Sequence, residues 1–234
     1  MNQLQCTVPT GDLLAQCRPK QMGVTYAITD DTVEIFLHGI IGDEYTQTDS
    51  LSVARILAEN RGKAVNMDVN SPGGLAYDGV AIFNAIKAHN GKTTGTISGQ
   101  AGSAASLAVV ACDVINCYPV GVFQPHYSMV MAFGHQADLQ QALGQLVQLD
   151  KDLETVYVEA SGQTLEKVQA DLIGPHGDGT VFGAQAAVDA GYVHKIIQHN
   201  KQKPAAAATS KSTALAARCV ALLELELDRQ IRSL

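Results

Sequence analysis

Short runs of β-branched residues alternate with helical patterns along the first half of the chain, and this alternation constrains the fold more than any other feature. Residues 32–39 (TVEIFLHG) and 63–70 (KAVNMDVN) are short, partly alternating in polarity and followed by turn residues, as expected for strands. Residues 49–60 between them have apolar positions at helical spacing, with Asp49 or Ser50 as the N-cap. A strand, a helix and a strand in this order predict a βαβ unit with parallel strands.

The same alternation continues toward the middle of the chain. Residues 77–91 are expected to form a helix that stops at Asn90-Gly91, and residues 93–98 (TTGTIS) a strand. A buried helix over 103–112 and a further strand and turn over 113–121 follow. The sequence therefore predicts an α/β protein with a mostly parallel sheet.

The second half of the chain begins with an unusually long helical pattern. Residues 136–162 keep an apolar helical period for about seven turns at 3.6 residues per turn. Such a helix either projects from a small core and pairs with another subunit, or lies across its own domain. Two short helices over 164–172 and 183–193 and a final strand over 194–198 are predicted after it.

These patterns divide the chain into one main domain and two flanking parts. We expect an N-terminal segment over 1–31 and the main domain over 32–199. Residues 200–214 (NKQKPAAAATSKSTA) are expected to form a low-complexity linker. Residues 215–234 are expected to form an apolar helix with charged residues toward its C-terminal end. We interpret this helix as an interaction element, the alternative being a tethered helix that returns to its own core.

Charge and cysteine content exclude several classes of protein. The net charge is −7, and the 16 Lys and Arg residues form no dense cluster, so a nucleic-acid partner is not expected. The five cysteines have no CxxC spacing, which indicates reduced thiols in a cytoplasmic protein. No export signal, membrane span or metal-ligand spacing is apparent in the sequence.

The stretch SGQAGSAASLAVVACD, residues 98–113, places a serine where a strand turns into an apolar helix. A serine hydroxyl becomes a nucleophile when an imidazole accepts its proton and backbone N–H groups stabilise the oxyanion. Ser103 would lie at a helix N-terminus, and the next residue, Ala104, would present one N–H. The glycines of NSPGG offer a second N–H at Gly74, and His126 in VFQPHYSMVM is a candidate base.

Several neighbouring residues are expected to have structural roles. Ser106, one turn beyond Ser103, should pack or bond a carbonyl, and Asn70 and Ser71 should shape the turn before the glycines. His135 should cap or flank the long helix, and His176 lies in a glycine-rich loop.

An ordered set of motifs resembles the proteolytic subunit of the Clp protease family. NSPGG, GQAGSAAS, a proline seven residues before the histidine, GHQADL, ASGQTLEKVQAD and AQAAVDAGYV follow one another at near-family spacing between residues 32 and 198. The chain also resembles the Clp-type proteases that mature bacteriophage heads. The resemblance implies the fold shared with crotonases, built of repeated β-β-α units with a long protruding helix, and serine endopeptidase activity without a cofactor.

By this resemblance Ser103 is the nucleophile and His126 the general base, and Gly74 and Ala104 supply the oxyanion hole. The family's catalytic aspartate falls on Asp171, at the end of GQTLEKVQAD. The following connection, LIGPHGDGTVFG, is longer than the family's, so a shifted loop would bring Asp178 to the histidine instead.

Departures from the family pattern bear on substrate and partners. Gly102 and Ala104 around the nucleophile are closer to the phage type, and YSMVMAFG after His126 replaces a polar, glycine-containing segment that binds substrate as an added strand. The resemblance implies a polypeptide substrate, such as a scaffold or capsid protein for the phage type, and a homo-oligomeric ring. Nothing before the first strand identifies the loops that meet an unfoldase ring, so an ATPase partner is not predicted.

Two rival functions remain open from the sequence. The crotonase-like fold also hosts acyl-CoA hydratases and isomerases, whose carboxylates transfer protons while glycine turns bind the oxyanion. A catalytically silent shell or scaffold protein would keep the fold for assembly alone. A Ser/Lys peptidase is a nearer variant, but no lysine stands in an obvious position for its base.

Overall fold

The computed structural model of the 234-residue chain describes residues 24–42 and 48–198. The predicted linker and C-terminal helix, residues 200–214 and 215–234, lie outside the described residues, as does most of the predicted N-terminal segment. The sheet begins at Thr25, seven residues before the expected start of the main domain, because an exposed strand pairs antiparallel with the first predicted one.

The described residues form one eight-stranded sheet in the order β1-β2-β3-β4-β5-β8, with β6 pairing with β4 and β7 with β6. The strand pairs from β2 to β8 along this order are parallel, as the alternation predicted. The two antiparallel pairs are β1 with β2 and β7 with β6. The strands are β1 (Thr25–Ile28), β2 (Thr32–Ile41), β3 (Ala64–Gly74), β4 (Thr93–Gly102), β5 (Val114–Cys117), β6 (Val122–Gln124), β7 (Phe182–Gly183) and β8 (Lys195–Ile196).

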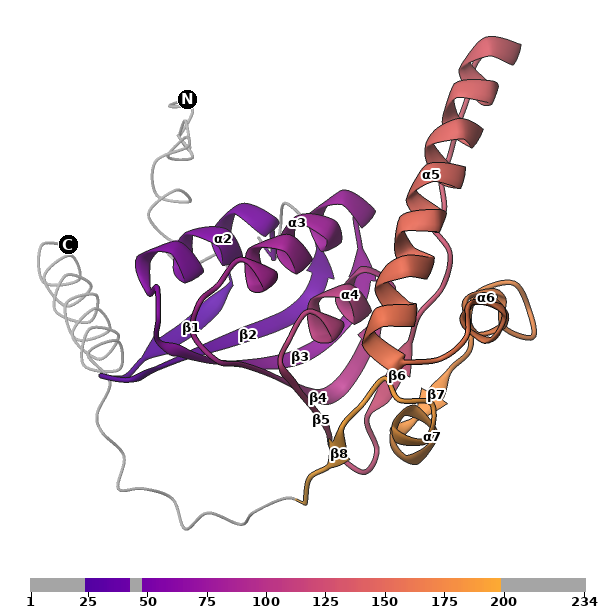
Figure 1. Cartoon of the computed structure of the whole chain (residues 1–234). Helices are drawn as coiled ribbons and strands as arrows, with labels where there is room; N and C mark the ends of the chain where they lie inside the picture. The colour runs from indigo at the N-terminus through magenta and orange to yellow at the C-terminus, as the bar shows by residue number, and fades with distance from the viewer. Residues whose placement is uncertain (1–23, 43–47, 199–234) are drawn as a thin grey trace, which may run out of the picture. The chain divides into compact units, whose positions relative to one another are not determined.

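Helices cover one face of this sheet (Figure 1). In β2 and β3 every second residue is buried, among them Ile35 and Met67, because these side chains point toward the helices. Asp49 caps the first helix through its carboxylate, which accepts from Ser52 N at 2.8 Å. The helices on this face are α2 (Ser50–Glu59), α3 (Ala76–Lys87) and α4 (Ala104–Val110), and all residues of α4 are buried.

Helix α5 (Gln136–Ser161) projects from the body, as one of the two sequence interpretations held (Figure 1). Its 26 residues correspond to about 39 Å at 1.5 Å per residue. His135 caps the helix in a capping box, and Gly162 ends it in the left-handed conformation at φ 70°. Its buried residues, Leu153 and Tyr157, both lie in its C-terminal half.

Two short helices complete the part of the chain that the structure describes, α6 (Leu165–Ile173) and α7 (Ala184–Asp189). Thr164 caps α6, and the aromatic ring of Tyr192 packs between Phe123 and Phe182 below them. No helix in the described ranges is long and apolar enough to cross a membrane.

Candidate active site

Ser103 occupies a strained turn between β4 and α4. Its φ of 50° and ψ of −124° make it the one non-glycine residue with positive φ in the described ranges. Such a backbone costs about 1–3 kcal/mol and persists where its surroundings hold it. The Ser103 N–H donates to the Gln124 carbonyl of β6 at 2.8 Å, which anchors the turn to the neighbouring strand. A serine on a sharp strand-to-helix turn presents its Oγ away from the backbone, as nucleophilic serines do.

The NSPGG turn at the end of β3 lies directly against Ser103. A Cβ at Gly73, whose φ is +100°, would be 2.5 Å from the Ser103 Cβ and 2.9 Å from the Ala104 nitrogen. Only glycine allows this approach. Ser71 shapes the turn as predicted, because its Oγ accepts from the Gly73 N–H at 3.0 Å. The peptide that joins Gly73 to Gly74 therefore lies beside the serine.

His126, which follows β6, lines the same cavity as Ser103. Its Nδ1 lies 2.5 Å from the Tyr127 carbonyl oxygen. Because a carbonyl can only accept, Nδ1 carries the proton in this contact, and Nε2 is left free to accept one. The cavity has a volume of about 50 Å³, and its remaining lining is mostly apolar: Ala76, Val80, Ala104, Leu107, Tyr127, Ser128, Met129, Leu149, Leu153 and Tyr157.

The segment after His126 is hydrogen-bonded to side chains of α5 and does not pair as a strand. The Tyr127 hydroxyl donates to Glu154 at 2.6 Å, and the Ser128 N–H and hydroxyl both donate to Asp150, at 2.9 and 2.5 Å. Burial and the neighbouring Glu154 carboxylate raise the pKa of Tyr127 above its usual value, so the phenol stays a donor. These hydrogen bonds hold the segment after His126 against α5, the helix whose residues Leu149, Leu153 and Tyr157 line the cavity.

Asp171, the aspartate favoured by the sequence, lies on α6 and is not among the residues that line the cavity. Its Oδ2 accepts from the Tyr192 hydroxyl at 3.0 Å and from Gln163 Nε2 at 3.1 Å. Burial, followed by the negative charge of Asp171, raises the pKa of Tyr192. The carboxylate is thus engaged in packing α6 against the core.

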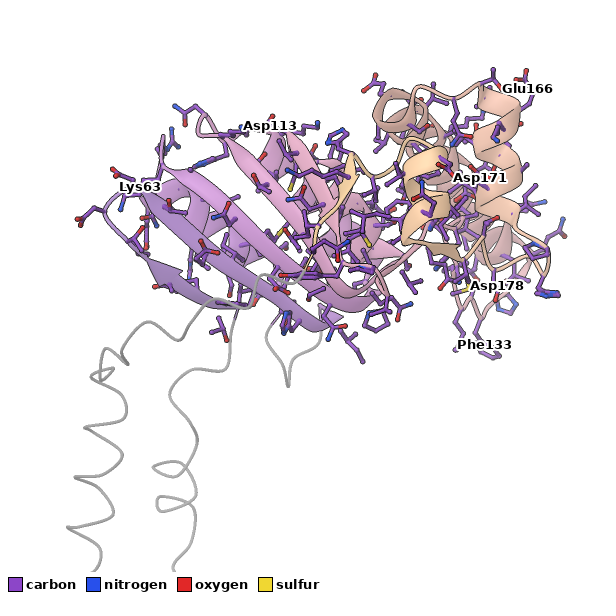
Figure 2. All side chains as sticks on the ribbon, turned by 90° about the horizontal axis from the view of Figure 1, so that it is seen from below. Lys63, Asp113, Phe133, Glu166, Asp171 and Asp178 are labelled. Atoms are coloured by element: carbon purple, nitrogen blue, oxygen red, sulfur yellow. The ribbon has the colours of Figure 1, made fainter. Side chains whose placement is uncertain are left out.

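Asp178, the alternative, lies in the loop after α6 (Figure 2). The Asp178 carbonyl accepts from Gln124 Nε2 at 3.1 Å. A Cβ at the next residue, Gly179, would overlap the Pro125 carbonyl oxygen and lie 2.6 Å from the His126 Cβ, so this loop packs against the backbone of Pro125 and the base of the histidine side chain. Within the described ranges, neither Asp171 nor Asp178 makes a carboxylate hydrogen bond to His126.

A pair of buried hydroxyls behind the nucleophile was only half foreseen. Ser106 Oγ donates to the Ser103 carbonyl at 2.6 Å, as expected of a helical serine, and also lies 2.5 Å from the Tyr157 hydroxyl on α5. The two residues are 51 positions apart, so no local pattern links them. The available signal was a tyrosine at a buried helical position, which needs a polar partner.

A strained serine at a strand-to-helix turn, against a glycine-rich turn and beside a histidine, is typical of serine hydrolases on α/β folds. Comparison with known proteins agrees with this class. A family model described as Clp protease matches residues 20–200. The ATP-dependent Clp protease proteolytic subunit 2 of Pseudomonas aeruginosa is 31% identical over 171 residues, which cover 72% of this chain and 83% of that protein.

The chain belongs to the Clp protease family. Its mixed α/β fold with the long α5 is consistent with that family, and membership supports peptide hydrolysis as the activity.

Proposed function

We propose that the chain is a serine endopeptidase with Ser103 as nucleophile and His126 as general base. The observation that carries this proposal is the strained Ser103 backbone at the N-terminus of α4. Ser103 lines a cavity that His126 also lines. The Nδ1–H tautomer supports the role of His126, because it leaves Nε2 unprotonated for the serine.

In the proposed reaction Ser103 Oγ attacks the carbonyl carbon of a peptide bond while its proton moves to His126 Nε2. The N–H groups of Gly74 and Ala104 donate to the oxyanion. The C–N bond then breaks, and the imidazolium gives its proton to the leaving amine. Water attacks the ester by the same route, which releases the carboxylate product and restores the serine hydroxyl. No cofactor takes part.

The close packing of Gly73 supports the assignment of the oxyanion hole. A Cβ added to its Cα would overlap both the Ser103 side chain and the Ala104 nitrogen. The peptide that carries the Gly74 N–H starts at this atom, so the two proposed donors come from adjoining pieces of backbone. Backbone donors held this rigidly need no reorganisation when the negative charge develops.

For the third member of the triad, contacts favour Asp178 over Asp171, the aspartate that the resemblance to the Clp family implies. The Asp171 carboxylate already has two donors, Tyr192 and Gln163. The loop of Asp178, in contrast, packs against Pro125 and the His126 Cβ. We propose that the Asp178 carboxylate accepts the Nδ1–H of His126 in the active form, in place of the Tyr127 carbonyl.

The biological role we propose is the maturation of a phage or prophage head, by cleavage of a scaffold or capsid protein. The Gly102-Ser103-Ala104 sequence around the nucleophile supports the phage type. The projecting half of α5 carries the exposed apolar side chains Leu139 and Leu143, which suit assembly into a homo-oligomeric ring. The enzyme would act in the cytoplasm, that of the host if phage-encoded, without an ATPase, nucleic-acid or membrane partner.

A second candidate, a silent shell protein of the same fold, is favoured by one observation. The described His126 bonds a backbone carbonyl and no carboxylate. A chain whose triad never assembles would form the same oligomer without hydrolysis.

A fluorophosphonate probe tests the proposal, because it reacts with an activated serine by releasing fluoride. The assembled wild type should form one adduct, located at Ser103 by mass spectrometry and absent from Ser103→Ala and His126→Ala. An assembled, folded wild type that forms no adduct would contradict the peptidase and favour the silent shell. Binding of acyl-CoA thioesters without serine reactivity would instead favour the crotonase-like enzyme.

A further inference from the structure

Two buried hydroxyls form a chain that ends on the backbone of Ser103. Ser106 Oγ lies 2.6 Å from the Ser103 carbonyl oxygen and 2.5 Å from the Tyr157 hydroxyl. Ser106 is 0% exposed and Tyr157 1% exposed, so no solvent competes for these bonds. The mechanism above uses neither residue.

The direction of the chain follows from its end. A carbonyl oxygen can only accept, so the single proton of Ser106 is donated to Ser103. Ser106 Oγ must then accept from Tyr157, which is the donor at the head of the chain. Burial raises the pKa of Tyr157 above its usual value, so the phenol keeps this proton throughout the working pH range.

The Ser103 carbonyl belongs to the same planar peptide as the Ala104 N–H. An orientation imposed on the carbonyl is therefore imposed on the N–H, which lies in the same plane and points in the opposite direction. Ser103 sits at an uncommon backbone geometry, φ 50° and ψ −124°, that needs external support. A charge-free chain of hydrogen bonds also polarises each member, which makes the N–H a better donor.

We propose that Tyr157 and Ser106 are positioning residues that aim and polarise the Ala104 N–H for the oxyanion. This inference rests on the proposed function, since it needs Ser103 as nucleophile and Ala104 as an oxyanion donor. Tyr157 is suited to the role because it is one of the two buried residues of α5, and its ring packs edge-on against Tyr192 at 6.1 Å. Its hydroxyl is thereby held at a fixed place behind the nucleophile.

The two residues act in series, and this distinguishes positioning from simple packing. Without Ser106 the Tyr157 hydroxyl cannot reach the Ser103 carbonyl, so losing both should cost no more than losing Ser106 alone. Two independent packing contributions would add instead.

The experiment measures fluorophosphonate labelling of the assembled full-length chain as a maximal rate (kinact) and a half-saturating probe concentration (KI). The variants are Tyr157→Phe, Ser106→Ala and both together. Ser161→Ala is the matched control. Ser161 Oγ also donates to a backbone carbonyl at 2.6 Å, that of Tyr157, but it does not belong to the hydrogen-bonded series Tyr157–Ser106–Ser103. Melting temperature is recorded for each.

We expect kinact to fall about threefold to tenfold in Tyr157→Phe and more than about tenfold in Ser106→Ala, a fraction of the 10²–10³ lost when an oxyanion donor is removed. KI should change less than about twofold, and the double variant should match Ser106→Ala. Ser161→Ala should keep its kinact.

Wild-type kinact in Tyr157→Phe and Ser106→Ala would overturn the positioning role while leaving the peptidase intact. Equal losses in Ser161→Ala, or losses that track melting temperature alone, would overturn it too. A wild type that labels at no serine overturns the proposed function and this inference with it.

Discussion

Gly73 and Ser103 approach so closely that a methyl group on Gly73 would be 2.5 Å from the Ser103 Cβ. The contact joins the ends of two parallel strands, β3 and β4, although the two residues are 30 positions apart in the sequence. It brings the amides of the NSPGG turn to the serine and supports a backbone that is strained at Ser103.

Replacing Gly73 by alanine should abolish labelling of Ser103, with a loss of more than about 100-fold, of the size seen when an oxyanion donor is removed. The new Cβ would force apart the turn and the Ser103 backbone, and φ of +100° would strain the alanine itself. We expect the free energy of unfolding to fall by about 1–3 kcal/mol.

Gly144→Ala is the matched control for this change. Gly144 lies in α5 with nothing within 4 Å of its added Cβ, so alanine there should stabilise the helix by about 0.5–1 kcal/mol and leave labelling intact. Denaturant unfolding and probe labelling check both variants, and an active Gly73→Ala protein would refute the close approach.

The two candidate aspartates predict opposite phenotypes on substitution by asparagine. Asp178→Asn should lower kinact by at least about 100-fold, because an amide no longer stabilises the imidazolium that forms on His126. Asp171→Asn should keep kinact within about threefold but lower the melting temperature, because Tyr192 loses a charged acceptor. Labelling kinetics and thermal unfolding separate the outcomes, and the reverse pattern would restore Asp171 to the triad.

The contact between Ser128 and Asp150 should matter for the placement of His126. Asp150→Ala removes the acceptor of two hydrogen bonds from the segment that follows the histidine. We expect kinact/KI to fall about tenfold, since a hydrogen bond to a charged group contributes about 1.5–3 kcal/mol. Asp152→Ala is the control, because among the described residues Asp152 accepts from Gln148 of the same helix alone. Equal activity of the two variants would contradict a role for this contact.

Asp113 should make the fold sensitive to acid. Its carboxylate accepts from the Thr93 N–H at 2.8 Å and hydroxyl at 3.0 Å, and the backbone bond is the main cause of a pKa below the usual 3.8. A carboxyl group whose pKa is lower in the folded state stabilises the fold at pH values above its unfolded-state pKa. This stabilisation is lost as the pH falls through the folded-state pKa.

Melting temperatures of wild type and Asp113→Asn between pH 7 and 3 test this expectation. The variant should have the lower melting temperature at neutral pH, and the difference in melting temperature between wild type and variant should become smaller in acid. Asp113 is not among the residues that line the cavity of Ser103, so Ser103 labelling should not change. A gap that stays constant with pH would exclude the carboxylate as its cause.

Local patterns were sufficient to predict the order of the main elements, because strand alternation, helical period and caps act over a few residues. The caps at Asp49 and His135 and the helix end at Gly162 were confirmed. The helix expected to reach Asn90-Gly91 ends at Lys87 instead, with Ala88 as its C-cap. Strands as short as β6 and β7 leave too little pattern to detect.

The nucleophile and the turn beside it could be predicted from sequence because each needs a special local residue type, a serine at a strand-to-helix turn and paired glycines. The choice between Asp171 and Asp178 could not, because it depends on the course of a loop packed against His126. Likewise, only the packing of α5 on α4 brings Tyr157 to Ser106. Sequence by itself determined what is local in the chain, and tertiary structure decided which distant polar groups meet, because burial forces such groups to find partners wherever the packing places them.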